Sequence, residues 1–371
     1  MNAVPAVAVS DSAADHALRL RDQALAALDA GDPASALAIA GAGLAALRAA
    51  GLGDGPDAAA VLVARAEIEE SLDRFGDATA TAAAAIKLLD SVAAEDTDDD
   101  CMLLWCQAQE RLASMERLAG DFGAATARLT MVLDRASAAF GEASLPVVSA
   151  ANALGVAYKY AADFGAAEAA YRRAMAAADA QGGPEPLILA GLLHNLGGLA
   201  HARGDFTAGI PLAERGAGLR AEALGTSHPD VARDWNALGA LYHLAGRFSD
   251  AVQIYHQALA VFEDHFGPDH FEVAMTCANL AVLRSDQGHC AEAEALGRRS
   301  LRIFEAALGP DDAEVGLTLL NLAMAVAGQG RQAEAAELAA RAAAILSARL
   351  PRDHPHVVAA GQALDRPRPP S

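Results

Sequence analysis

The chain has 371 residues, of which 53% are hydrophobic and only 5% aromatic, and its 48 acidic and 28 basic residues give a net charge of −20. A charge of this sign repels nucleic acid and anionic membrane surfaces, so neither is an expected partner. No stretch approaches the roughly 20 apolar residues that span a bilayer. Four cysteines without paired short spacings argue against a disulfide framework and favour a cytoplasmic location.

Residues 1–15 are expected to be flexible, and a repeat pattern then occupies residues 16–350. A small or turn-forming residue recurs along this region, usually with Phe two positions later, as in Gly204-Asp205-Phe206. The interval is 42 residues, except for one step that is five residues longer. The turns are predicted near residues 31, 73, 120, 162, 204, 246, 288 and 330. A period of this length predicts a stack of identical supersecondary units.

Each unit is predicted to be a helical hairpin. In the unit around Gly246, residues 230–245 place Trp235, Leu238 and Tyr242 on one helical face, and a second helix follows over 248–265. A single hairpin cannot bury its apolar face, so stability requires stacking on neighbours. The sequence therefore predicts an all-α fold, a right-handed α-solenoid of about eight hairpins.

Two segments depart from the repeat pattern. The five extra residues fall most plausibly at 95–100, which is too acidic to be buried and is predicted to be a solvated loop. After the last hairpin, residues 351–365 are predicted to form a C-terminal capping helix. Residues 366–371 are Pro- and Arg-rich and are expected to be a flexible tail.

The repeated residues resemble the tetratricopeptide repeat. The resemblance rests on Leu-Gly or Leu-Ala in the first helix, the Gly turn, and Phe or Tyr with Ala in the second helix. The 42-residue period, the Leu-Gly-x-x-His-Pro linker at 224–229 and the Asn-Leu-Ala strings at 279–281 and 321–323 resemble the kinesin-light-chain type. The resemblance implies the fold strongly and the function weakly, because such repeats occur in many unrelated scaffolds.

A column of asparagines is expected on the concave side of the solenoid, which the first helices line. An amide both donates and accepts, so it suits the backbone of an extended peptide. In the family that the chain resembles, groove asparagines of this kind contact peptides. The alternative is that these amides brace neighbouring helices. The five positions are Asn152, Asn195, Asn236, Asn279 and Asn321.

A second column is basic. Arg117, Lys159, His201 and His243 hold one equivalent position in four successive units, and Arg111, His194 and Arg233 lie nearby. Together they could make a locally positive groove that attracts an acidic partner segment, more strongly once the histidines are protonated. The alternative is an ordinary solvated helix flank.

No catalytic or cofactor motif interrupts the repeats. The glycines recur as helix breaks with no strand before them, which argues against phosphate loops and dinucleotide turns. Stacked helices hold equivalent histidines roughly 10 Å apart, too far to share a metal. The sequence thus predicts a non-enzymatic protein with no cofactor and no metal.

The function favoured by the sequence is an interaction scaffold that binds a peptide or partner segment in the concave groove. The alternative is a regulatory or sensor subunit whose ligand-dependent conformation controls a separate enzyme or transcription factor. The identity of the partner and the oligomeric state are not decided by the sequence.

Overall fold

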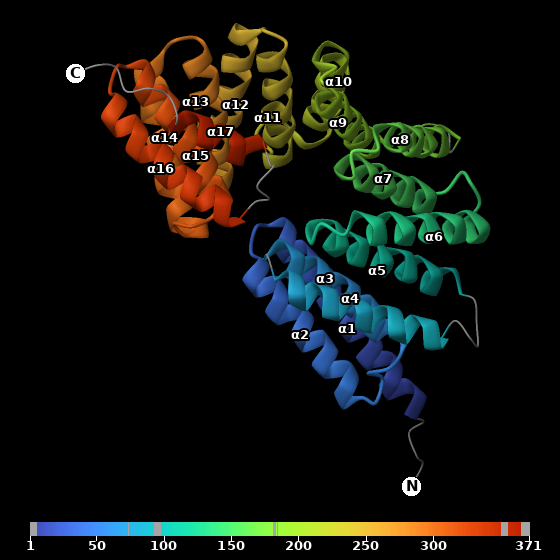
Figure 1. Cartoon of the computed structure of the whole chain (residues 1–371). Helices are drawn as coiled ribbons and strands as arrows, with labels where there is room; N and C mark the ends of the chain where they lie inside the picture. The colour runs from blue at the N-terminus through green and yellow to red at the C-terminus, as the bar shows by residue number, and fades with distance from the viewer. Residues whose placement is uncertain are drawn as a thin grey trace. The chain divides into compact units, whose positions relative to one another are not determined.

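The computed structural model describes residues 6–72, 74–92, 98–180, 183, 185–349 and 355–364. All regular secondary structure in these ranges is helical, which confirms the predicted all-α repeat fold (Figure 1). The helices are α1 (Ala6–Asp29), α2 (Pro33–Ala49), α3 (Pro56–Ser71), α4 (Phe75–Val92), α5 (Asp99–Leu118), α6 (Phe122–Phe140), α7 (Leu145–Tyr160), α8 (Phe164–Asp179), α9 (Pro186–Arg203), α10 (Phe206–Leu224), α11 (Pro229–Leu244), α12 (Phe248–Phe266), α13 (Phe271–Asp286), α14 (Cys290–Leu308), α15 (Ala313–Gly328), α16 (Gln332–Arg349) and α17 (Pro355–Leu364).

The chain divides into two compact units, residues 1–185 and 186–371. We call them the N-terminal and C-terminal units. The N-terminal unit contains α1 to α8, and the C-terminal unit contains α9 to α17. The sequence predicts one continuous solenoid over residues 16–350. The division falls at a Gly- and Pro-containing stretch, 182–186, between the end of α8 and the start of α9.

Within each unit the helices pair as hairpins. Each odd-numbered helix up to α15 is the first helix of a hairpin, and the following even-numbered helix is the second. In the N-terminal unit, the first helices α1, α3, α5 and α7 also contact one another in order. One face of this unit is therefore built from first helices alone.

The hairpin turns use left-handed backbone. Gly204 and Gly246, for example, have φ of 79° and 77°, which glycine adopts without a steric penalty. Ala162 stands at the equivalent position of the fourth hairpin with φ of 59°, and it is the one non-glycine with positive φ among the described residues. In the turns at residues 32, 121 and 163 an aspartate then caps the second helix, as the Asp121 carboxylate does by accepting from the Ala124 N–H at 3.0 Å.

Glycines in the first helices let aromatic rings of the second helices approach the backbone. A Cβ added at Gly239 would lie 2.6 Å from the Tyr255 ring, and one at Gly155 would lie 2.5 Å from the Tyr171 ring. Both tyrosines are buried. The close approach of helix to helix therefore depends on the missing side chain at these two positions.

The ends of the repeat region differ from the sequence expectation in one respect. Helix α1 begins at Ala6, within the segment 1–15 that the sequence predicts to be flexible. At the other end α17 lies inside the range predicted for a capping helix, and its Ala360 is buried in the core of the C-terminal unit. The predicted turn residue Asp73, residues 95–97 of the predicted acidic loop and the tail at 366–371 lie outside the described residues. The rest of that predicted loop is not loop throughout, because Asp98 caps α5 and Asp99 and Asp100 are its first two residues.

Candidate functional site

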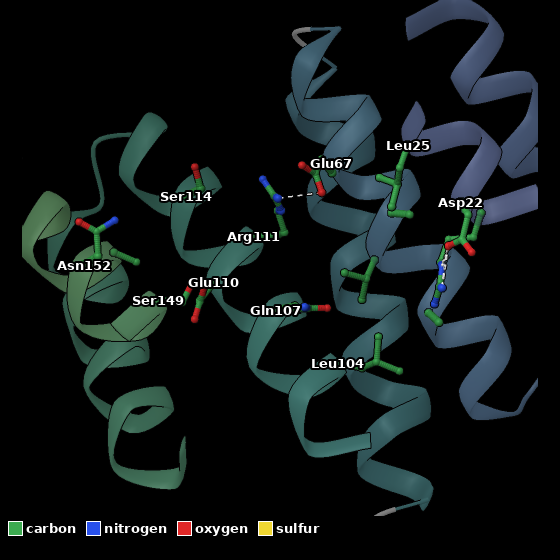
Figure 2. Close-up of a pocket in the computed structure, with 15 residues that line it drawn as sticks. Asp22, Leu25, Glu67, Leu104, Gln107, Glu110, Arg111, Ser114, Ser149 and Asn152 are labelled. Carbon is green, nitrogen blue, oxygen red and sulfur yellow. Dashed lines mark hydrogen bonds and ion pairs between the residues drawn. The ribbon is translucent and has the colours of Figure 1, made fainter. Parts of the chain in front are cut away.

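A cavity of about 570 Å³ lies on the face that the first helices make in the N-terminal unit (Figure 2). Apolar side chains such as Val63 and Leu104 form part of its lining, beside charged and polar groups. All four first helices contribute: Arg21, Asp22 and Leu25 from α1; Ala60, Val63, Ala64 and Glu67 from α3; Leu104, Gln107, Glu110, Arg111 and Ser114 from α5; and Ser149, Asn152 and Ala153 from α7.

Both arginines of the lining are already engaged by carboxylates. Arg21 contacts its neighbour Asp22 at 2.7 Å. Arg111 reaches from α5 to α3, where it contacts Glu67 at 2.8 Å (Figure 2). It also contacts Glu70 at 3.2 Å. The Ser114 hydroxyl also donates to Glu70, at 2.8 Å. These contacts fix the guanidinium of Arg111 against α3.

Glu110 is the unusual carboxylate of the lining. Among the described residues it has no ion-pair partner, and its polar contact is the Ser149 hydroxyl of α7, which donates to it at 2.7 Å. Burial raises the pKa of Glu110 to about 7, although the Ser149 hydrogen bond and the charge of Arg111 both act to lower it. A half-buried carboxylate that titrates near neutrality therefore faces the cavity.

The asparagine column divides between two kinds of environment. Asn152 lines the cavity and is half-buried. In the C-terminal unit the Asn236 amide donates to the Thr276 hydroxyl at 3.2 Å and accepts from the Asn279 amide at 3.4 Å. Asn236 and Asn279 thus join α11 to α13, which is the bracing role that the sequence left open. Asn195 and Asn321 are half-buried in α9 and α15.

In the N-terminal unit, the basic column begins with two cations beside one aromatic ring. The Arg117 guanidinium lies 4.9 Å from the centre of the Tyr160 ring, and the Lys159 ammonium lies 5.2 Å from it. Burial and the nearby charge of Arg117 lower the pKa of Lys159. Arg117 also donates to Ser114 at 3.3 Å, which places it next to the cavity although it is not part of the lining.

In the C-terminal unit the predicted basic residues mostly face carboxylates. His194 lies 2.8 Å from the buried Asp234, and His243 lies 2.8 Å from Asp286. Arg233 pairs with Glu272 at 2.7 Å and with Asp230 at 2.5 Å. His201 is exposed, and its ring meets Phe206 edge-on. Three of these four side chains therefore lie against a carboxylate.

The described residues contain no group of three or more His, Cys, Asp or Glu side chains that could hold a metal ion. None of the described helices is both long enough and apolar enough to cross a membrane. Burial raises the pKa of the Cys106 thiol, one turn before Glu110, to about 12.

Glu110 was missed by the sequence prediction, yet the repeat period could have found it. It stands ten residues before the turn residue Gly120, just as Asn152 and Asn236 stand ten residues before Ala162 and Gly246. Arg111 likewise occupies the position that Asn195 and Asn279 hold in their units. The cavity is therefore built at the predicted asparagine positions, with other residue types in the first three hairpins.

Residues 188–264, 235–306 and 272–348 match the tetratricopeptide-repeat family model. Among solved structures, BtubC (BKLC) from P. vanneervenii is 24% identical with a TM-score of 0.53, covering 60% of this chain and 90% of its own. A Rap protein complexed with competence and sporulation factor is 10% identical with a TM-score of 0.58, over 95% of this chain and 97% of its own.

A third solved structure is the Rap conjugation gene regulator of the plasmid pLS20 in complex with the Phr* peptide. It is 12% identical with a TM-score of 0.57, and the match covers 79% of this chain and 74% of that one. At these identities the structures show likeness of fold. No curated protein matches the sequence. The family match shows tetratricopeptide repeats over residues 188–348, and the remaining described helices continue the same succession of helical hairpins.

Proposed function

We propose that this chain is a non-catalytic interaction protein that holds an extended segment of a partner protein against the first helices of its N-terminal unit. The observation that carries the proposal is the cavity of about 570 Å³, to which four successive hairpins contribute side chains. A preformed concave surface spares the receptor most of the ordering cost of binding. It also offers several contacts along one line, which suits an extended chain.

The lining supports a peptide better than a small metabolite. Apolar groups such as Val63 and Leu104 alternate with amide, hydroxyl and charged groups of α5 and α7. Side chains of a peptide could use the apolar positions while its backbone uses groups such as the Asn152 amide. Two of the structural neighbours are complexes, one with competence and sporulation factor and one with the Phr* peptide. Their fold agrees with a binding role for stacked hairpins.

The test is to fill the cavity without changing the fold. Ala153 of α7 lines the cavity and is half-buried, so Ala153→Trp should obstruct it. The matched control is Ala139→Trp on α6, where the side chain is exposed on a second helix. Proteins captured from a lysate of the source organism by wild type and by Ala139→Trp, but lost with Ala153→Trp, would support the proposal. Identical captures with all three, at equal helicity by circular dichroism, would show that the cavity is not the binding site.

A further inference from the structure

The charged groups of the cavity are unequally matched. Arg21 and Asp22 neutralise one another, and the charge of Arg111 is shared by Glu67 and Glu70. Glu110 remains, with a neutral hydroxyl as its hydrogen-bond donor. Within the lining, Arg21 and Arg111 face Asp22, Glu67 and Glu110, so one carboxylate is left without a cation, at the position where α5 faces α7.

The geometry of Glu110 leaves room for a second donor. Ser149 donates to the Oε2 atom, and an ionised carboxylate can accept about four hydrogen bonds. A charge-assisted hydrogen bond at a half-buried site is stronger than one in open water, because the local dielectric constant is lower. Nearby apolar groups, Leu104 and Val63 among them, suit the aliphatic stem of a long basic side chain.

We propose that the cavity binds a lysine or arginine side chain of the partner segment, whose positive charge pairs with the Glu110 carboxylate. This inference rests on the proposed function and adds the chemical class of the ligand. It differs from the acidic partner that the basic column suggests, since Arg117 and Lys159 lie beside Tyr160 and outside the lining. An acidic side chain placed against Glu110 would meet a like charge.

Binding of a cation should be linked to deprotonation of Glu110. The pKa of this carboxyl is about 7, so near neutrality a large part of the unbound protein carries a proton there. The charged groups of the lining besides Glu110 are Arg21 and Asp22 of α1, Glu67 of α3 and Arg111 of α5. Glu70 of α3 and Arg117 of α5 contact lining residues, and the Cys106 thiol lies one turn before Glu110. The pKa of the buried Cys106 thiol is about 12, so it stays neutral in this range. Affinity should therefore rise with pH across neutrality.

The experiment selects binders from a phage-displayed library of random 12-residue peptides. Targets are the whole wild-type chain, Glu110→Gln, Ala153→Trp, and Asp134→Asn, which removes an exposed carboxylate of α6 as a control for net charge. Peptides enriched on wild type should carry at least one Lys or Arg. Replacing that basic residue of the peptide by Gln should weaken binding about tenfold or more, measured by fluorescence anisotropy. Glu110→Gln in the protein should weaken binding of the original peptide by a similar factor. The two substitutions together should weaken binding no further than either one alone.

Two further readouts complete the test. Wild-type affinity should rise about tenfold between about pH 6 and about pH 8 and stay level in Glu110→Gln, while Asp134→Asn should match wild type. Enriched peptides that lack a basic residue but are lost with Ala153→Trp would overturn the inference and leave the proposed function standing. Acidic peptides lost with Arg117→Glu would overturn it in favour of the basic column. If Ala153→Trp binds every recovered peptide as well as wild type does, the proposed function itself is contradicted.

Discussion

The Ser149 hydroxyl of α7 donates a hydrogen bond of 2.7 Å to the Glu110 carboxylate of α5. This contact joins the third and fourth hairpins at the wall of the cavity, where the pKa of Glu110 is raised to about 7 because the carboxyl is buried. A cavity wall that favours the protonated acid has consequences for stability as well as for binding.

The stability of the N-terminal unit should depend on the ionisation of Glu110. Its pKa is higher in the folded chain than the ordinary value of 4.5, so its contribution is fully present below about pH 4.5 and is lost as the pH rises through about 7. The Gln side chain of Glu110→Gln does not ionise, so the variant does not lose this stability as the pH rises. The variant should be more stable than wild type by about 1 to 3 kcal/mol above neutrality and equal to it in acid.

Urea denaturation followed by circular dichroism over a pH series measures this difference. Asp134→Asn, which replaces an exposed carboxylate of α6, is the control for the loss of one negative charge. A constant difference between Glu110→Gln and wild type across the series would contradict the assigned pKa.

The Asn236–Asn279 contact should brace the C-terminal unit. Asn279→Ala removes the donor to Asn236 and should lower the free energy of unfolding by about 0.5 to 1.5 kcal/mol. A double-mutant cycle with Asn236→Ala isolates the coupling between the two amides. Additive effects of the two substitutions would show that the amides act independently.

The contribution of the amide column to binding stays a prediction. A groove that extends along the amide column predicts weaker partner binding at unchanged helicity when Asn195, Asn279 and Asn321 are together replaced by Ala, whereas a site confined to the N-terminal unit predicts normal affinity. Isothermal titration calorimetry with a partner identified by the capture experiment measures this. Normal affinity in a destabilised triple variant would assign the column to bracing alone.

Replacing Ala162 by glycine should raise the free energy of unfolding of the N-terminal unit. The φ of 59° at Ala162 costs an L-residue about 1 kcal/mol, whereas glycine adopts it freely but orders more backbone on folding. Ala162→Gly should therefore stabilise the N-terminal unit by a net of about 0.5 kcal/mol or more. The reverse change at the equivalent turn, Gly120→Ala, should destabilise it, since Gly120 has φ of 81°. Thermal unfolding measures both variants, and the midpoint temperature should rise for Ala162→Gly and fall for Gly120→Ala.

Gly239 should not tolerate a methyl group. An added Cβ would lie 2.6 Å from the buried Tyr255 ring, so Gly239→Ala should destabilise the C-terminal unit by about 1 to 3 kcal/mol. Gly218 of α10 is the control, because nothing lies within 4 Å of a Cβ added there. Gly218→Ala should be neutral or stabilising by up to about 1 kcal/mol. Equal denaturant midpoints for the two variants would refute the steric argument.

The sequence predicted the all-α hairpin repeat because the residues that determine it are local and periodic. Turn residues such as Gly246 break a helix wherever they occur, and Leu238 and Tyr242 share a face by helical geometry alone. The same period identifies equivalent positions in every hairpin, and those positions line the cavity in the N-terminal unit.

What the period could not predict is the environment of each equivalent position. In the sequence His243 belongs to the basic column, and His194 and Arg233 lie near it, yet each meets a carboxylate from another helix. Asn236 and Asn279 contact one another across neighbouring hairpins. The sequence by itself determined which residues are equivalent, because helical periodicity is a local property. Only the tertiary structure decided which of them are paired and which, like Glu110, face the cavity without a cation, because charge pairing and burial depend on distances between helices that no local pattern contains.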